Sequence, residues 1–220
     1  MSLVARYLIL GAGKFGRLAL ARLAWQEAAA FVVVDRQPEA LAAARDLAVS
    51  EVEWVAAEAI AFLAAHLRDK PPWDWLIPMV PGHVAAAWLL AGPLAGWETV
   101  PVPAAVGEWA SVWSRGPEGQ LYLSRAAHLC PDDCPEPDSI CPVSGESREV
   151  ALFAELAAVN LSGWFTAVIP SRQLAPGVGG YPPGELLALA RELPKRRGQV
   201  LIATACRCHG VVHGLKRGER

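Results

Sequence analysis

Five cysteines, grouped in two short segments, are the residues of this chain best suited to metal or redox chemistry. The first segment reads CPDDCPEPDSICP and holds three of them, each followed by proline, and the second reads ACRCHG. The residues are Cys130, Cys134, Cys141, Cys206 and Cys208, with His209 directly after the last. Because proline fixes the backbone dihedral φ, it restricts where the first three thiols can lie. A single site forms if the final apolar stretch brings the second segment beside the first.

Two metal chemistries fit these residues. The three thiolates of the first segment, joined by Cys206 or Cys208, can ligate an iron–sulfur cluster. The same four, or three thiolates with His209, can hold a tetrahedral zinc ion. Nearby carboxylates raise a thiol pKa unless a cation is bound, so we favour a bound metal. Because proline after a ligand cysteine is a ferredoxin feature, we favour iron–sulfur over zinc. The alternatives are a redox disulfide between Cys130 and Cys134, and a purely apolar role for Cys206.

A glycine loop near the N-terminus predicts a nucleotide site. The motif GAGKFG lies between an apolar run typical of a buried strand and a helical pattern. In that setting Gly11 makes the tight turn, Gly13 lets a pyrophosphate approach the backbone, and Gly16 lets helix and strand pack closely. The diphosphate would lie at the helix N-terminus. The cofactor-binding residues expected in the loop are Gly11, Ala12, Gly13, Lys14, Phe15 and Gly16.

An acid at the end of the second predicted strand completes this pattern. Asp35 closes the apolar run AFVVVD, where a carboxylate is expected to bind the ribose hydroxyls of NAD. Arg36 follows directly and could meet the 2′-phosphate of NADP. The expected cofactor is therefore NAD, with NADP as the alternative, and both residues are expected to contact it.

The stretch YLILGAGKFGRLALARL, followed by FVVVDR, resembles the N-terminal NAD-binding domain of Trk-type potassium-uptake regulators. The resemblance covers about residues 4–90 and implies a Rossmann fold with nucleotide contacts at Gly11, Gly13, Gly16 and Asp35. Two features depart from that family: AAE stands at residues 56–58, where the family often has Gly-Asp, and PMVPGH follows the fourth strand. The resemblance does not extend to the cysteine-rich part of the chain.

His83, in PMVPGH, is the candidate catalytic residue. It lies just past the fourth predicted strand, and the carboxyl ends of parallel strands face the ligand crevice in such folds. An imidazole there can act as general acid or base or contact a nicotinamide. A histidine that merely begins a helix and faces water is the alternative.

Alternating strand and helix patterns over the first hundred residues predict an α/β fold with a doubly wound parallel sheet, whose fifth strand is WETVPVP. Beyond them the patterns predict helices over 104–114 and 147–160, strands over 119–126 and 163–171, a loop over 173–184 and a final buried strand over 198–208. We expect a Rossmann domain over residues 1–125 and a smaller cysteine-containing α/β extension over 126–220.

Composition limits the class of protein. The chain has 220 residues, 53% apolar and 19% charged, which is typical of a globular protein. No apolar run is long enough to span a bilayer and the N-terminus lacks the shape of a signal peptide, so we expect a cytoplasmic protein whose thiols are reduced. Net charge is −2, and the basic residues of segment 191–220 are better explained as a solvated surface than as a nucleic-acid site.

Two functions follow from these features. The preferred one is an NAD(P)-binding oxidoreductase with a cysteine-ligated metal or iron–sulfur site near the nucleotide. The alternative, implied by the regulator resemblance, is a sensor that binds a nucleotide without turnover and uses the thiols as structural zinc ligands or redox sensors. A sensor needs a dimer face, so a homodimer is the assembly expected in that case.

Overall fold

The N-terminal part of the chain forms a parallel sheet. The computed structural model describes residues 4–25 and 29–218. Its first four strands are β1 (Ala5–Leu10), β2 (Ala29–Asp35), β3 (Val52–Ala56) and β4 (Trp75–Pro78). They pair in the order β3-β2-β1-β4, all parallel. The connecting helices are α1 (Lys14–Leu23), α2 (Pro38–Arg45) and α3 (Ala59–His66), and α4 (Val84–Ala91) follows β4. The predicted α/β class with a Rossmann-like sheet is confirmed.

Helices cover both faces of this sheet because its strands are apolar on both faces. Along β1, Leu8 and Leu10 belong to the core shared with α3 and α4, whereas Tyr7 and Ile9 face α1 and α2. This alternation is the two-residue period of a strand, with both sides buried.

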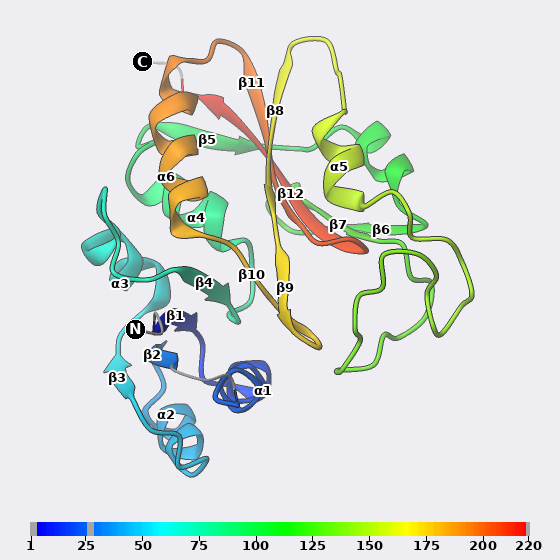
Figure 1. Cartoon of the computed structure of the whole chain (residues 1–220). Coiled ribbons are helices and arrows are strands. Elements are labelled where there is room, and N and C mark those ends of the chain that lie inside the picture. Colours follow the sequence, from blue (N-terminus) through cyan, green and yellow to red (C-terminus); the bar gives the residue numbers. More distant parts are fainter. Residues whose placement is uncertain (1–3, 26–28, 219–220) are drawn as a thin grey trace.

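The second sheet is mixed and is built from the rest of the chain (Figure 1). Its strands are β5 (Trp97–Val100), β6 (Val112–Arg115), β7 (Leu121–Ser124), β8 (Trp164–Pro170), β11 (Gln199–Ala205) and β12 (His209–Arg217). The order is β6-β7-β12-β11-β8, and β5 also pairs with β12. A Cβ added at Gly214 would lie 2.6 Å from the carbonyl oxygen of Val100, so only glycine allows this close pairing of β12 with β5.

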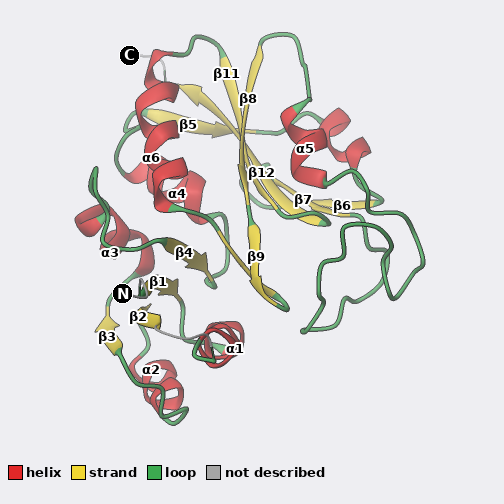
Figure 2. Ribbon diagram, in the orientation of Figure 1, coloured by secondary structure: helices red, strands yellow, loops and turns green. Residues whose placement is uncertain are grey.

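The two sheets share one core and are linked by a hairpin. Apolar side chains of α3, α4 and α6 (Pro183–Glu192) pack in a single cluster with residues of both sheets, while α5 (Leu152–Ala157) and the 3-10 helix η1 (Ala104–Trp109) cover the other face of the second sheet. A second short 3-10 helix, η2 (Leu193–Lys195), follows α6. The hairpin of β9 (Arg172–Ala175) and β10 (Val178–Gly180) reaches down toward α1 and β4 (Figure 2). Just after it, Tyr181 exchanges two backbone hydrogen bonds with Leu76 of β4.

Four local predictions differ from the structure. The strand WETVPVP does not extend the parallel sheet, because β5 pairs antiparallel with β12. Residues 104–114 form a 3-10 helix and then β6, since pairing with β7 outweighs their helical spacing. The loop over 173–184 holds the hairpin of β9 and β10, and the last strand is not final, because β12 follows it. The helix within 147–160 is confirmed but shorter.

Sheet pairing crosses residue 125, the predicted boundary between domains, because β5, β6 and β7 precede it and β8, β11 and β12 follow it. The end of the first predicted helix at residue 26 and the last two residues of the basic segment lie outside the described residues. Within residues 4–25 and 29–218, no helix has the length and apolar character needed to cross a membrane.

Candidate functional site

The glycine loop has the geometry that its sequence predicts. Gly11 has a φ of +105°, and a Cβ there would lie 2.7 Å from the carbonyl oxygen of Met79. A Cβ at Gly16 would lie 1.9 Å from the carbonyl oxygen of Gly11, so this glycine is required by the packing of α1 on the loop. A Cβ at Gly13, in contrast, would have no atom of residues 4–25 or 29–218 within 4 Å. The fold itself therefore requires Gly11 and Gly16 but does not require Gly13.

Asp35 ties the end of β2 to this loop. One carboxylate oxygen accepts a hydrogen bond of 2.7 Å from the backbone N–H of Ala12, and the other accepts one of 2.8 Å from the backbone N–H of Gln37. Each carboxylate oxygen has a second lone pair, so the group can still accept hydroxyl donors from the crevice.

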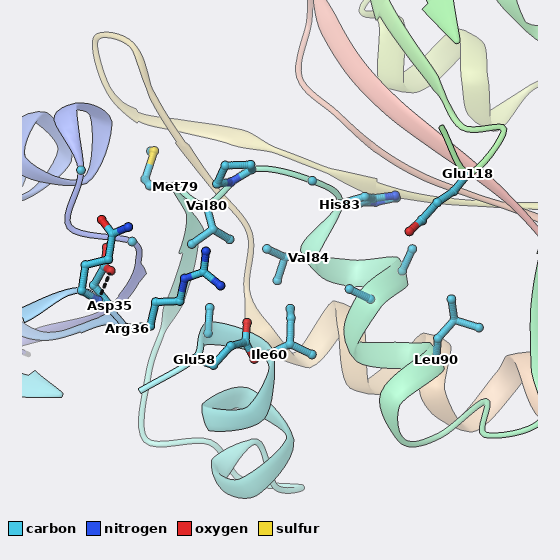
Figure 3. A pocket seen from close by; sticks show the side chains of 18 of the residues that line it. Asp35, Arg36, Glu58, Ile60, Met79, Val80, His83, Val84, Leu90 and Glu118 are labelled. Atoms are coloured by element: carbon cyan, nitrogen blue, oxygen red, sulfur yellow. Dashed lines mark hydrogen bonds between the residues drawn. The ribbon is translucent and has the colours of Figure 1, made fainter. Parts of the chain in front are cut away.

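A cavity of about 650 Å³ lies along the carboxyl ends of β1, β2 and β4. Of the predicted cofactor and catalytic residues it is lined by Gly11, Gly13, Asp35, Arg36 and His83. Figure 3 shows Asp35, Arg36 and Glu58 at one end and His83 with Glu118 at the other. Ala12, Lys14, Phe15 and Gly16 do not line it, although they belong to the same loop. We call this cavity the nucleotide pocket, after the nucleotide that the sequence predicts beside the glycine loop.

Two histidines meet at the far end of the nucleotide pocket. The Nδ1 atoms of His83 and His213 lie 3.0 Å apart, and each residue is only 5% exposed. His83 Nε2 lies 2.6 Å from Thr204 Oγ1, and His213 Nε2 lies 3.4 Å from a carboxylate oxygen of Glu118. The side chains come from the start of α4, from β12, from β11 and from the turn between β6 and β7. His83 is therefore a buried member of a hydrogen-bonded chain of four residues, which excludes the water-facing alternative.

Burial makes this pair sensitive to acid. Burial, and then the neighbouring ring, lower the pKa of His83 well below its ordinary value, and burial also lowers the pKa of His213. Below the unfolded pKa of about 6.5, the unfolded chain takes up protons that the native pair refuses, so stability falls with falling pH. The expected loss is up to about 1.4 kcal/mol per pH unit for each histidine.

Urea unfolding at about pH 7.5 and about pH 5.5 measures this loss. His83→Gln should lose less stability between the two conditions than the wild type. His66→Gln, at an exposed position on α3, should lose as much as the wild type. Equal losses in all three proteins would contradict the assignment.

The two cysteine segments meet in a second cavity of about 550 Å³, which we call the thiol cavity. Its lining includes every predicted metal-site residue, namely Cys130, Cys134, Cys141, Cys206, Cys208 and His209. The His209 ring lies between two thiols, with Nε2 3.7 Å from Cys130 Sγ and Nδ1 4.0 Å from Cys206 Sγ. The thiols follow the walls and do not converge: within the described residues, no group of three or more His, Cys, Asp or Glu side chains is arranged to hold a metal ion.

Backbone amides point at two of these sulfur atoms. Cys206 Sγ accepts hydrogen bonds from the N–H groups of Cys208, at 3.5 Å, and His209, at 3.3 Å. Hydrogen bonds from Ser144, and from the backbone of Ser144 and Val143, lower the pKa of Cys141 to about 7. Burial, followed by the charge of Glu136, raises the pKa of Cys206 to about 12. Amide donors stabilise thiolates, but burial in the same cavity opposes ionisation unless a positive charge is present.

One positive charge is built into this cavity. Arg148 lines it and its side chain is 5% exposed. The guanidinium donates to Glu146 and to backbone oxygens, yet its Nε is buried and has no hydrogen-bond partner in the part of the chain that the structure describes. A buried cation with an unused donor is costly unless it faces negative charge, so Arg148 suits a cavity that holds thiolates or an anionic group.

The loop that carries Cys130, Cys134 and Cys141, which we call the thiol loop, is bound to α1, the helix that follows the glycine loop. Lys14 Nζ lies 2.6 Å from a carboxylate oxygen of Asp132, and Arg22 donates to the backbone oxygens of Asp132 and Pro176. Phe15 lines the thiol cavity. Lys14, predicted as a cofactor contact, thus pairs with the thiol loop, and Phe15, predicted likewise, lines the thiol cavity.

Sequence patterns did not identify Thr204, Glu118 or Arg148 as site residues, and they did not pair His213 with His83. The His83–His213 contact joins residues 130 positions apart, and no local motif marks such a pair. A histidine within an apolar strand, as in GVVHGL, is the one signal that could have raised the question.

Comparison with known proteins places the chain in a family. A family profile described as "Uncharacterized protein, C-terminal domain" matches residues 82–218. An uncharacterized protein of Archaeoglobus fulgidus is 34% identical to this chain in an alignment 220 positions long, which covers 95% of this chain and 98% of that protein. No solved structure gives a significant match. The matched domain begins just before His83 and excludes the glycine loop, so the resemblance to potassium-uptake regulators stays a prediction. The chain belongs to the family of proteins that carry this C-terminal domain, joined here to a Rossmann-like N-terminal module.

Proposed function

We propose that this protein binds NAD(P) in the nucleotide pocket and performs redox chemistry there, with an iron–sulfur cluster or another cysteine-ligated metal in the thiol cavity. The observation that carries the nucleotide assignment is Gly13. It lines the pocket, and the chain leaves open space where its Cβ would be. Packing gives no reason for glycine at this position, whereas a pyrophosphate that approaches the backbone does.

The rest of the pocket supports a dinucleotide. Its volume of about 650 Å³ falls in the range of cofactor sites, and it runs from the acid at the end of β2 to the histidine pair. Asp35 would receive the ribose hydroxyls at one end, and the reacting part of the cofactor would lie toward His83. One end of the cavity is therefore suited to binding the ribose, and the end with the two histidines is suited to proton transfer.

Replacing Asp35 tests this orientation and the choice between NAD and NADP. Asp35→Asn keeps an oxygen for the Ala12 N–H but removes the charge, so NADH binding should weaken by about tenfold or more, equivalent to about 1.4 kcal/mol. NADPH binding should weaken less, because a 2′-phosphate is no longer repelled and Arg36 remains.

Fluorescence titration with NADH and NADPH gives both dissociation constants. Asp46→Asn, an exposed position just after α2, is the matched control and should bind as the wild type does. Binding of neither nucleotide by the wild type would refute the proposal, and unchanged affinities in Asp35→Asn would refute the orientation.

The thiol cavity fits an anionic, thiolate-ligated group. It offers five thiols, the imidazoles of His128 and His209, and a buried guanidinium, and such a positive charge offsets the negative charge of a thiolate-bound cluster. Thiols spread over the walls of a cavity of about 550 Å³ suit a group larger than a single ion, which favours a cluster over zinc. When bound, the cluster would supply one-electron chemistry, and Arg148 would stabilise its charge.

A nucleotide sensor is the second candidate function, and one contact favours it. Lys14 follows Gly13 at the N-terminus of α1 and pairs with Asp132 of the thiol loop. A diphosphate bound at that helix end would compete with Asp132 for the lysine, so nucleotide binding and the state of the thiols would be linked. Turnover of NADH with a hydride or electron acceptor decides for the enzyme; tight binding without turnover decides for the sensor.

A further inference from the structure

The four-residue chain at the end of the nucleotide pocket has only two self-consistent arrangements of its protons. A neutral imidazole carries one N–H and one bare nitrogen. Two Nδ1 atoms 3.0 Å apart therefore share one hydrogen, which belongs either to His83 or to His213. Whichever ring carries it, the Nε2 of that ring is bare and the Nε2 of the other ring is protonated. The tautomers of the two rings are locked together.

The ends of the chain accept both arrangements. Thr204 carries a hydroxyl that can donate to a bare His83 Nε2 or accept from a protonated one. The Glu118 carboxylate only accepts, so it favours a proton on His213 Nε2. Its contact of 3.4 Å is long and its side chain is 62% exposed, so a bound molecule can take its place. The titratable groups that act on the pair are the two rings themselves and Glu118.

We propose that Thr204, His83, His213 and Glu118 form a proton relay in which His213 Nε2 exchanges a proton with the substrate and His83 sets the tautomer. This inference rests on the proposed nucleotide function. Both rings line the pocket, and a buried imidazolium is costly, so a relay that keeps both rings neutral suits this environment better than a single charged base.

In carbonyl reduction, bound NAD(P)H would supply the hydride to the carbonyl carbon, and His213 Nε2 would give its proton to the carbonyl oxygen. His213 Nδ1 takes the shared hydrogen from His83 Nδ1, and His83 Nε2 takes the hydroxyl proton of Thr204. Thr204 is half-buried on β11 and regains a proton from water. One hydride and one solvent proton are consumed, and alcohol oxidation runs the same steps in reverse.

The relay also indicates the substrate class. The polar groups at this end are neutral imidazoles and an acid, and the nearby lining is apolar, including Val84 and Leu90. A carboxylate or phosphate beside Glu118 would be repelled. The substrate expected is a small, uncharged carbonyl compound or alcohol.

Nitrogen NMR of histidine-labelled protein tests the coupling without any knowledge of the substrate. The chain has only five histidines, and ring-nitrogen shifts report each tautomer. Glu118→Gln replaces the acceptor by an amide, so it should shift the tautomer ratio of His213 and equally that of His83, which Glu118 does not touch. Thr204→Val should shift both ratios from the other end. His66 is an internal control, and Glu108→Gln, at an exposed glutamate outside the pocket, is the matched variant.

NADH affinity of the same samples separates this proposal from the proposed function. Coupled tautomers together with NADH binding support the relay. If NADH binds normally but the His83 tautomer ratio does not change in Glu118→Gln, the relay is overturned and the nucleotide assignment is not. Absence of NADH binding in the wild type overturns the nucleotide assignment and, with it, the role of the pair in that pocket.

Discussion

Gly13→Ala should weaken NADH binding strongly and leave the fold intact. The backbone of Gly13 has a φ of −66°, which alanine adopts readily, and an added Cβ meets no atom of the described residues. The methyl group would instead occupy the place where a pyrophosphate must approach the backbone of the loop. We expect NADH affinity to fall by at least about tenfold, or about 1.4 kcal/mol, with a thermal midpoint close to that of the wild type.

Gly16→Ala is the matched variant with the opposite expectation. Its Cβ would lie 1.9 Å from the carbonyl oxygen of Gly11, so helix α1 must move off the loop. Overpacking of this kind costs about 1–3 kcal/mol or more, and the thermal midpoint should fall by several degrees. Thermal unfolding and NADH titration of both variants give the comparison. Full NADH affinity in Gly13→Ala would remove the observation on which the nucleotide assignment rests.

Anaerobically purified protein should contain iron and acid-labile sulfide, and losing them should destabilise it. Metal binding that occurs only in the native state adds directly to folding stability. The thiol cavity holds five cysteines where a cluster needs four ligands. Serine at Cys130, Cys134 or Cys141 should therefore remove most of the iron. Of the variants Cys206→Ser and Cys208→Ser, one should lose the cluster and the other should retain it.

The variant that retains the cluster is the control for the effect of a serine in this cavity. Iron and sulfide are measured on each protein, with the thermal midpoint before and after chelation. If the protein contains zinc and no sulfide, the bound group is a single ion rather than a cluster, and the sensor alternative is favoured. If the protein contains no metal and all five thiols are free, the metal assignment is wrong and only the nucleotide assignment remains.

The strand–glycine loop–helix arrangement could be predicted well because its determinants are local. Gly11, Gly13 and Gly16 lie within six residues, and the strand before them and the acid at the end of β2 follow from short-range patterns. Local patterns did not show that Lys14 pairs with Asp132 and that Phe15 lines the thiol cavity. Both contacts join α1 to a segment more than a hundred positions away, and no local pattern carries that information. The predicted cofactor contacts of Lys14 and Phe15 stay predictions.

The second sheet was harder to predict because its order depends on long-range pairing. β12 reads HGVVHGLKR, which lacks the even alternation of a half-buried strand. Its place between β11 on one side and β5 and β7 on the other is decided by partners from three parts of the chain. The histidine relay is a by-product of that arrangement, since His213 lies on β12 and Thr204 on β11.

The position of β12 also governs the order in which the protein can form during synthesis. The strand lies within the second sheet, pairs with β5, β7 and β11, and comes later in the chain than all three. The Rossmann-like sheet can assemble as soon as its own strands leave the ribosome, since chains fold from the N-terminus. β5 and β7 must wait until β12 has been synthesised, and the edges that β12 covers remain open to association until then. A chain that lacks β12 would have a formed glycine loop, an unassembled second sheet and neither His213 nor a closed relay.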